Sequence, residues 1–263
     1  MISPIVEFQN LSYSIEGRLI LENITFSVNR GEYLSIIGPN GAGKSTLIKC
    51  LDRINLGWTG NIKLDGKPLE NYKQKEIARK IGYVPQADGR LYPFSVYEFI
   101  LMGRYPYLSP FSSISNEDKQ IVKDCMKSTQ TEHIADRLMD TLSGGERQKV
   151  FIAAALAQGA EILLLDEPTT FLDYHHQVDV LNLLNEVNKN KNITVISVTH
   201  DINSAVRCSS MIVALKNGKI VFHDTPQELV KRKIPESIFE TSFQYINQPY
   251  QGFPILVSGD IIE

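Results

Sequence analysis

The stretch of sequence that decides the fold is Gly38-Pro39-Asn40-Gly41-Ala42-Gly43-Lys44-Ser45. It follows the pattern G-x-x-x-x-G-K-[ST], whose glycines let the backbone turn tightly and point successive N–H groups at phosphate oxygens. A strand-like run, Tyr33 to Ile37, precedes it, and a helix-like run, Thr46 to Leu51, follows it. A surface turn can carry the same letters by chance, but rarely between a strand and a helix. The stretch therefore predicts a loop that binds a nucleoside triphosphate.

The side chains of this loop suit ATP and magnesium. Lys44 adds a positive charge, and the hydroxyl of Ser45 can ligate a magnesium ion that bridges two phosphates. The helix that begins near Lys44 points the positive end of its dipole at the same phosphates. The residues expected to contact the nucleotide here are Gly38, Pro39, Asn40, Gly41, Ala42, Gly43, Lys44, Ser45 and Thr46.

Composition sets broad limits on the protein. The chain has 263 residues, of which 43% are hydrophobic and 22% charged, as in globular domains. A net charge of −3, with Lys and Arg scattered along the chain, argues against binding to nucleic acid. Cys50, Cys125 and Cys208 lack metal-ligand spacing, which favours reduced cysteines that serve in packing. No signal peptide appears, and no apolar run approaches the roughly 20 residues that span a bilayer, so we expect the chain alone to be soluble.

The spacing of apolar residues predicts strands and helices on both sides of the phosphate-binding loop. Apolar positions among polar neighbours, from Ile5 to Val28 and from Ile62 to Leu64, predict short strands in a small antiparallel layer. The region from Leu91 to Ser143 is mostly helical in period and predicts an insertion between two core strands. Met211 to Leu215 and Ile220 to Phe222 predict a hairpin.

The first part of the helical region is rich in aromatic residues. They are Tyr92, Phe94, Tyr97, Phe99, Tyr105 and Tyr107, with Pro93, Pro106 and Pro110 among them. A solvated loop does not need so many large rings. Core packing and a surface for a partner protein explain the enrichment equally well, and the sequence leaves both open.

A second glycine-rich helix start lies at Ser143-Gly144-Gly145-Glu146. Ser143 and Glu146 have the spacing of a capping box, which is the simplest explanation of this stretch. A cap does not need two consecutive glycines, which leave bare N–H groups at a helix N-terminus and can bind an anion. One chain would then carry two phosphate-binding surfaces but a single phosphate-binding loop. This count indicates a second copy of the chain.

Two carboxylates follow the apolar run Ile162 to Leu165, which is typical of a buried parallel strand. Open α/β sheets bind ligands at the carboxyl ends of such strands. Asp166 can hold magnesium through water, and Glu167 can orient and deprotonate an attacking water. A helix cap or a solvated turn is the alternative, but the phosphate-binding loop upstream favours catalysis.

Two further side chains are candidates for the nucleotide site. His200 ends the buried run from Ile193 to Thr199, a place that favours contact with the terminal phosphate or the attacking water, although a lone histidine is usually structural. Asp201 after it predicts a helix N-cap. Tyr13 can stack on an adenine or can be a half-buried strand residue, and the residue type alone decides neither.

These motifs, in this order, resemble those of the nucleotide-binding domain of the ABC transporter superfamily. The family's Walker A, Q-loop, signature, Walker B, D-loop and H-loop motifs correspond here to Gly38 to Ser45, Gln86, Leu142 to Glu146, Ile162 to Glu167, Leu172-Asp173 and His200. The resemblance covers nearly the whole chain, and the signature is highly specific. It implies an α/β fold with a RecA-like P-loop core, an antiparallel β subdomain and an inserted α-helical subdomain. We expect one domain over residues 1–263, with the helical subdomain at about 88–160 and a C-terminal extension at about 235–263.

The resemblance also implies how the site is assembled. Two copies would form a head-to-tail homodimer, with each ATP between the Walker A motif of one and Ser143 to Glu146 of the other. Gln86 would act beside Glu167 and His200 and would ligate magnesium, and Asp173 would reach the nucleotide. The position of Tyr13 resembles the adenine-stacking A-loop. Glu146 replaces the commoner glutamine that ends the signature.

Longer stretches narrow the branch of the family. They are Ala78 to Gln86, Pro93 to Phe99, Leu101 to Tyr107 and Asp166 to Asp173, and they resemble the ATPases of bacterial iron-siderophore, haem and cobalamin importers. Part of this pattern is shared with manganese and zinc importers. The resemblance implies an ATPase at the cytoplasmic face of the membrane, bound to separate permease subunits and served indirectly by a solute-binding protein. The permease would contact a groove lined by Leu91 to Tyr107.

Two other classes of ABC protein remain as alternatives. An exporter ATPase is disfavoured because no membrane segment is fused to the chain. A soluble ABC ATPase that acts on ribosomes or DNA is disfavoured because the chain has one P-loop and no long coiled coil.

Overall fold

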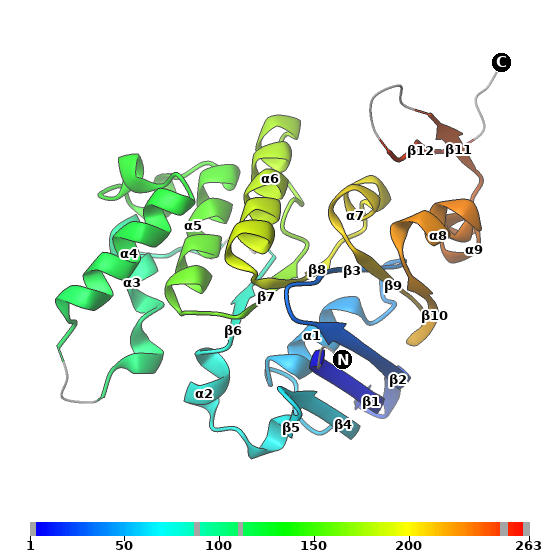
Figure 1. Ribbon diagram of the computed structural model, residues 1–263, viewed down its shortest axis with the longest axis horizontal. Coiled ribbons are helices and arrows are strands. Elements are labelled where there is room, and N and C mark those ends of the chain that lie inside the picture. The colour runs from blue at the N-terminus through cyan, green and yellow to red at the C-terminus, as the bar shows by residue number, and fades with distance from the viewer. Residues whose placement is uncertain (1–3, 87–89, 110–112, 248–251, 260–263) are drawn as a thin grey trace. The chain divides into compact units, whose positions relative to one another are not determined.

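The computed structural model describes residues 4–86, 90–109, 113–247 and 252–259 (Figure 1). The chain forms two compact units, the first made of Met1–Leu69 with Ile196–Glu263 and the second of Glu70–Val195. The bounds expected for the helical subdomain, about 88–160, fall inside the second unit and stay a prediction. Among the described residues, no helix is long and apolar enough to cross a membrane.

The first unit begins with an antiparallel sheet of the order β2-β1-β4-β5. Its strands are β1 (Pro4–Ile15), β2 (Arg18–Asn29), β4 (Thr59–Leu64) and β5 (Lys67–Pro68). The predicted antiparallel layer is therefore confirmed, but its first two strands are long, with 12 residues each, and not short. Register shifts between Phe8 and Ser14 explain the difference, because they interrupt the alternation that marks a continuous strand.

A second group of strands in this unit carries the phosphate-binding loop. β3 (Tyr33–Ile37) is fully buried and pairs in parallel with β9 (Met211–Lys216). β9 pairs antiparallel with β10 (Lys219–Asp224), which confirms the predicted hairpin. α1 (Lys44–Leu51) follows the loop and buries Leu47, Ile48 and Leu51, while β8 (Thr194–Val198) crosses the boundary between the two units.

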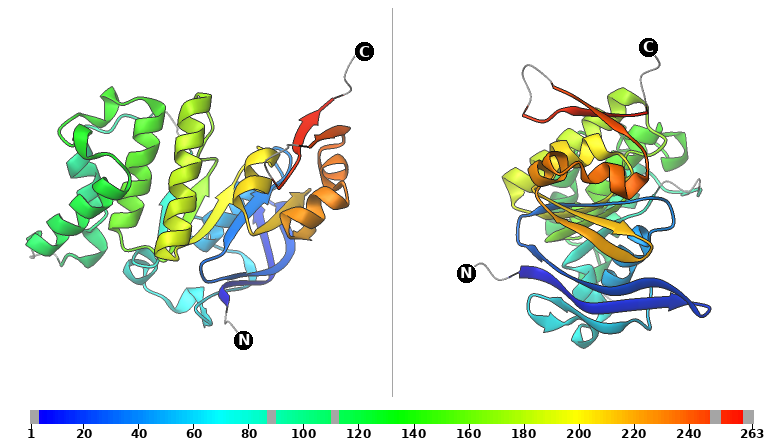
Figure 2. Two further views of the ribbon diagram at one scale, coloured as in Figure 1. Left: turned by 45° about the horizontal axis from the view of Figure 1, so that its top comes forward. Right: turned by 90° about the vertical axis from the view of Figure 1, so that its right-hand side faces the viewer.

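Three short helices and a hairpin complete the first unit. They are α7 (Ile202–Cys208), α8 (Pro226–Lys231), α9 (Ile234–Phe239), β11 (Phe243–Ile246) and β12 (Ile255–Ser258). The hairpin lies beside these helices in both views of Figure 2. The amide of Asn203 on α7 donates to the carbonyl of Leu256 over 2.9 Å and accepts from its N–H over 2.8 Å. β12 is therefore held to α7 by a pair of hydrogen bonds.

The second unit combines two parallel strands with helices. β6 (Ile81–Val84) pairs in parallel with β7 (Ile162–Asp166), and β7 is the buried strand predicted from the apolar run Ile162 to Leu165. The helices are α2 (Gln74–Ala78), α3 (Val96–Met102), α4 (Asn116–Ser128), α5 (Gly144–Ala157) and α6 (Tyr174–Lys191), with short helices η2 (Tyr105–Tyr107), η3 (Glu132–Ile134) and η4 (Met139–Thr141); η1 (Leu69–Asn71) lies at the unit boundary. α3, α4 and α5 pack together (Figure 1), burying Ile100, Val122 and Val150 completely.

The aromatic residues before α3 and within it have different environments. The rings of Tyr92, Phe99 and Phe151 form one cluster, with centroids 5.3 to 5.7 Å apart. Packing against the buried ring of Phe151 therefore accounts for Tyr92 and Phe99, which are half-buried. Leu91 is 77% exposed and Tyr105 is 58% exposed, so part of the segment lies on the surface. Pro110 lies outside the described residues.

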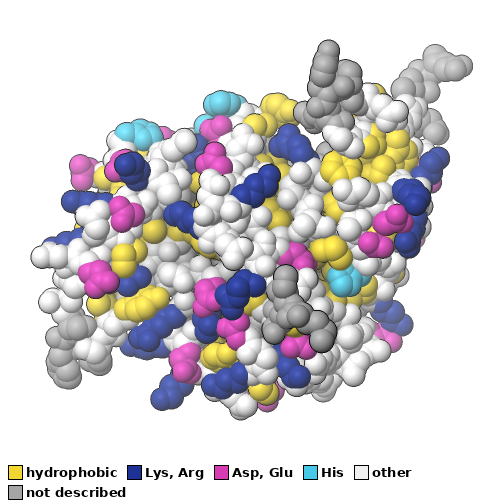
Figure 3. Space-filling view, viewed as in Figure 1, with side chains coloured by type: hydrophobic (Ala, Val, Ile, Leu, Met, Phe, Trp, Pro, Cys, Tyr) yellow, Lys and Arg dark blue, Asp and Glu magenta, His cyan; other side chains and the backbone are white. Residues whose placement is uncertain are grey.

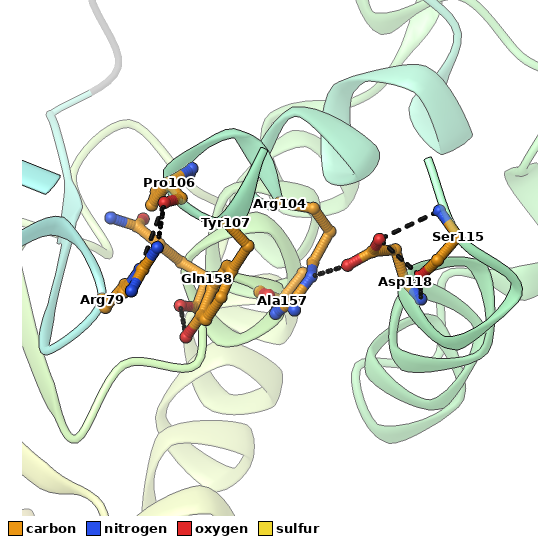
Figure 4. A network of polar contacts seen from close by, with 8 residues as sticks. All are labelled: Arg79, Arg104, Pro106, Tyr107, Ser115, Asp118, Ala157 and Gln158. Atoms are coloured by element: carbon orange, nitrogen blue, oxygen red, sulfur yellow. Dashed lines mark hydrogen bonds and ion pairs between the residues drawn. The ribbon is translucent and has the colours of Figure 1, made fainter. Parts of the chain in front are cut away.

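Tyr107 belongs to a polar cluster that joins several helices of the second unit (Figure 4). The guanidinium carbons of Arg104 and Arg79 lie 3.9 and 4.8 Å from the centre of its ring. Arg104 is buried and donates to Asp118 over 2.8 Å and to the carbonyl of Ala157 over 2.7 Å. The end of α5, the start of α4 and the segment after α2 are thus tied together around one ring.

The surface carries charges of both signs. In Figure 3, lysine and arginine side chains alternate with aspartate and glutamate over the face shown. This distribution agrees with the small net charge of −3, and the expectation that the protein does not bind nucleic acid stays a prediction.

Candidate functional site

The loop between β3 and α1 is shaped by glycine at three positions. Gly38, Gly41 and Gly43 have φ angles of 144°, 78° and 97°, in the region where a side chain is strained. Neighbouring strands also exclude side chains from two of them. A Cβ at Gly38 would overlap the carbonyl oxygen of Leu215 on β9, and a Cβ at Gly43 would lie 2.7 Å from Cδ2 of Leu21 on β2. The loop therefore needs glycine for its own fold.

Lys44 stands at the start of α1, as predicted, and turns back over the loop. Its Nζ donates to the carbonyl of Gly38 over 2.8 Å and to that of Pro39 over 3.0 Å, and the residue is only 6% exposed. Ser45 and Thr46 follow in the first turn of α1 and are half-buried. The loop thus combines a charged ammonium, a hydroxyl and a helix N-terminus, which together suit a phosphate chain.

The other two candidates of the first unit, His200 and Tyr13, lie near the ends of strands. His200 is exposed directly after β8. Its neighbour Thr199 donates its N–H to the carbonyl of Ile36 on β3 over 3.1 Å, and Asp201 caps α7 as predicted. Tyr13 lies on β1 opposite Leu21 and is half-buried. That burial is compatible with both interpretations of Tyr13.

In the second unit, the carboxylates after β7 have specific partners. Asp166 is 3% exposed, and the hydroxyl of Tyr83 on β6 donates to its Oδ2 over 3.1 Å. Glu167 has a φ of 50°, and its Oε2 accepts from the Gln86 side-chain amide over 3.2 Å and from the Thr170 hydroxyl over 2.9 Å. The structure therefore brings together Gln86 and Glu167, which the sequence placed in separate motifs.

Sequence reasoning missed Tyr83 and Thr170 as parts of this carboxylate site. The parallel register of β6 and β7 sets Tyr83 opposite Leu164, two residues before Asp166. No local pattern in the sequence indicates that pairing. Thr170 lies three residues after Glu167, and this spacing is the one signal that could have pointed to it.

The start of α5 is a capping box, as predicted. Oγ of Ser143 accepts from the N–H of Glu146 over 3.2 Å, and Oε2 of Glu146 accepts from the N–H of Ser143 over 2.8 Å. Arg137 also bonds Oε1 of Glu146 over 2.9 Å. These partners, with the Ser143 backbone bond as the largest cause, hold the pKa of Glu146 below its usual value. The glutamate therefore serves the cap at this position.

Each of the two glycines after Ser143 lies close to a side chain from α6 or from the segment that leads into it. A Cβ at Gly144 would lie 3.0 Å from Cδ2 of Leu172, and a Cβ at Gly145 would lie 2.5 Å from Cγ of His176. Asp173 caps α6 by accepting from the N–H of His176 over 2.9 Å. Asp173, expected at the nucleotide, is exposed, while His176 was not singled out by the sequence.

Comparisons of the sequence with known proteins all lead to ATP-binding proteins of ABC transporters. Residues 21–170 match the family model described as ABC transporter. The ferric enterobactin transport ATP-binding protein of Escherichia coli is 42% identical over 90% of this chain and 88% of its own. The iron(3+)-hydroxamate import ATP-binding protein of Bacillus subtilis is 36% identical over 97% of this chain and 95% of its own.

Solved structures show the same likeness. An inward-facing transporter assigned to the metal-chelate type has a TM-score of 0.85 at 27% identity, with 98% of this chain and 99% of that chain covered. The ATP-binding cassette MJ0796, in a dimeric post-hydrolysis state with ADP and phosphate, has a TM-score of 0.71 at 30% identity, with 84% and 98% covered.

Proposed function

The chain belongs to the ABC transporter family, and from that premise we propose that it is the ATP-hydrolysing subunit of an importer for a metal chelate. Cassettes of this family bind and hydrolyse ATP, so the predicted ATPase activity and ATP cofactor are confirmed. The predicted RecA-like ABC ATPase fold is also confirmed by the structural neighbours.

The arrangement around Glu167 is the observation that carries the catalytic proposal. In this proposal Glu167 orients the attacking water and accepts its proton, while Gln86 and Thr170 hold its carboxylate in one orientation. His200 completes the set as a partner of the terminal phosphate or of that water. Fixed orientation matters because a general base acts only within hydrogen-bond reach of the proton that it removes.

Magnesium is part of the proposal because the donors suit it. The expected ligands Ser45, Gln86 and Asp166 offer oxygen atoms, which magnesium prefers. Among the described residues, no group of three His, Cys, Asp or Glu side chains could hold a metal alone, which agrees with an ion that also depends on the nucleotide's phosphates. When bound, magnesium neutralises charge on the phosphates. Lys44 would add to this neutralisation, because its ammonium would leave the carbonyls of Gly38 and Pro39 and donate to charged phosphate oxygens instead.

The partners follow from the same premise. We propose a homodimer in which the N-terminus of α5, with Ser143 and Gly144 exposed, closes the nucleotide bound to the P-loop of the other copy. Within the described residues, the N–H groups of Gly144 and Gly145 make no hydrogen bond, which supports this role. Permease subunits would bind the surface part of the segment Leu91 to Tyr107, and a solute-binding protein would deliver the chelate to them.

The cargo proposal rests on the relatives that import iron chelates, and uptake by cells tests it. Cells that lack the gene should lose uptake of a ferric siderophore, haem or cobalamin, and the wild-type gene should restore it while Glu167→Gln should not. Uptake of free Mn²⁺ and Zn²⁺ serves as the comparison. Loss of manganese or zinc uptake with normal uptake of all the chelates would contradict the proposed cargo.

A further inference from the structure

His176 lies so close to Gly145 that no side chain could be added to this glycine in the present arrangement of α5 and α6. A Cβ on Gly145 would lie 2.5 Å from Cγ, 2.7 Å from Cβ and 2.8 Å from Nδ1 of His176. No residue but glycine fits there without a shift of one of the two helices. The imidazole thus sits directly under the second residue of α5, at the helix end that carries the signature motif.

The same side chain faces the segment before α6. Its Nε2 lies 3.8 Å from Oδ2 of Asp173, whose Oδ1 accepts from the backbone N–H of His176. One turn further along both helices, Lys149 of α5 donates to Asp179 of α6 over 3.0 Å. α5 and α6 run beside each other in Figure 1. The ion pair joins them one turn into each helix, and the imidazole contact joins them at their N-terminal ends.

The position of the ring has an energetic penalty. Nδ1 is buried and has no hydrogen-bond partner among the described residues. An unpaired buried polar atom destabilises a fold, so an apolar side chain would serve packing better. A buried polar atom without a partner needs an explanation, and function is one of the usual ones.

We propose that His176 is a positioning residue for ATP hydrolysis, which holds the N-terminus of α5 at a set distance from Asp173. This inference rests on the proposed function, because the N–H groups of Gly144 and Gly145 are useful only if they meet a phosphate. In this role His176 acts through the backbone of α5 and not through contact with the nucleotide. A displacement of about 1 Å at such donors can lower turnover by about 100-fold.

Three variants test the proposal in the full chain. His176→Ala removes the contact and should lower kcat by about tenfold or more, while the KM for ATP changes less than about threefold. His176→Asn keeps Cβ, Cγ and a polar atom in the place of Nδ1, which are the three atoms that meet Gly145, so it should restore kcat to within about threefold of wild type. His175→Ala is the control, because that side chain is 82% exposed and lies one residue away.

Each outcome decides between explanations. An equal loss of kcat in His176→Asn and His176→Ala would overturn the proposal that His176 acts through its contact with Gly145. It would indicate instead that the imidazole acts through Nε2 and Asp173. Wild-type kcat in His176→Ala would overturn the inference but leave the proposed function intact. Absence of ATP hydrolysis by the wild-type chain, alone and with its permease, would overturn both.

A thermal-unfolding cycle tests the contact without any ATPase assay. Gly145→Ala should lower the melting temperature in the wild-type background, because its methyl group meets the imidazole. In the His176→Ala background the same substitution should lower it much less, since the space is then open. Equal shifts in the two backgrounds would contradict the contact that carries the proposal.

Discussion

The side-chain amide of Gln86 donates a hydrogen bond of 3.2 Å to Glu167, although the helical region of the second unit separates the two residues along the chain. The Thr170 hydroxyl bonds the same carboxylate oxygen over 2.9 Å. Gln86, which follows β6, and Thr170, which follows β7, thus donate to the same oxygen of Glu167. A movement of the segment at Gln86 would therefore change the hydrogen bonding of the Glu167 carboxylate.

Glu167→Gln should lower ATP turnover by about 10²–10⁴-fold, because an amide cannot accept the proton of the attacking water. ATP binding should persist, since the P-loop is unchanged. Phosphate release and equilibrium binding of ATP measure the two effects. Glu186→Gln is the control, because this carboxylate is exposed on α6. Wild-type hydrolysis by Glu167→Gln would show that another group acts as the base.

Ser143→Ala should reduce hydrolysis more than Ser115→Ala does. Both serines cap a helix through a capping box, on α5 and α4 respectively, and loss of either cap should destabilise the protein by about 1 kcal/mol. Only Ser143 belongs to the surface proposed to close the nucleotide of a second copy. Turnover measured over a dilution series should also rise more than linearly with protein concentration.

Strictly proportional turnover by a proven monomer would contradict the composite site. Equal losses of turnover in the two serine variants, matched by equal losses of stability, would reduce the role of Ser143 to helix capping.

Phe94→Ala and Phe99→Ala should fail in different ways. Phe99 is half-buried and packs against Tyr92 and Phe151, so its truncation should destabilise the second unit by about 1–2 kcal/mol. Phe94 is half-buried and should anchor the permease, so its loss should weaken that complex by about 2 kcal/mol and leave basal hydrolysis in place. Melting temperature, basal ATPase and permease pull-down on both variants measure this. An unchanged pull-down for Phe94→Ala would count against the docking surface.

Acid should selectively remove the contribution of Asp118 to stability. The Ser115 hydroxyl, followed by Arg104, lowers the pKa of Asp118 to about 2. A carboxylate with a depressed pKa stabilises the fold fully above its unfolded pKa, about 3.9, and loses that effect as the pH falls toward 2. The shift corresponds to about 2 kcal/mol at neutral pH.

Urea unfolding between pH 6 and pH 2 measures this contribution in wild type and Asp118→Asn. The variant should be the less stable protein at neutral pH, and the gap should close as the acid limit is reached. A gap that stays constant down to pH 2 would mean that the carboxylate's charge contributes nothing.

The sequence predicts those features of the fold and site that depend on neighbours along the chain. The P-loop, the Ser143 and Asp201 caps and the buried strand before Asp166 all follow from local spacing. The lengths of the first two strands were wrong because backbone irregularities interrupt their alternation.

Contacts between distant segments were not predictable in the same way. Tyr83 reaches Asp166 through a strand register, and His176 reaches Gly145 through the packing of two helices. Neither arrangement leaves a periodic trace in the sequence. The aromatic segment shows a related limit, since enrichment in rings did not reveal that Tyr107 stacks between two arginines while Tyr105 stays exposed.

The close approach of Gly38 to the Leu215 carbonyl has a consequence for mutagenesis of the P-loop. A substitution at Gly38 would push β9 away or distort the loop before any nucleotide arrives, so a loss of ATP binding in that variant could not be attributed to a lost phosphate contact. A substitution at Lys44 creates no such overlap and removes a charge from the phosphate site, but it also removes the bonds from Nζ to the carbonyls of Gly38 and Pro39, so its stability must be measured beside its affinity. Gly38 serves the architecture first, and a variant there measures folding and affinity together.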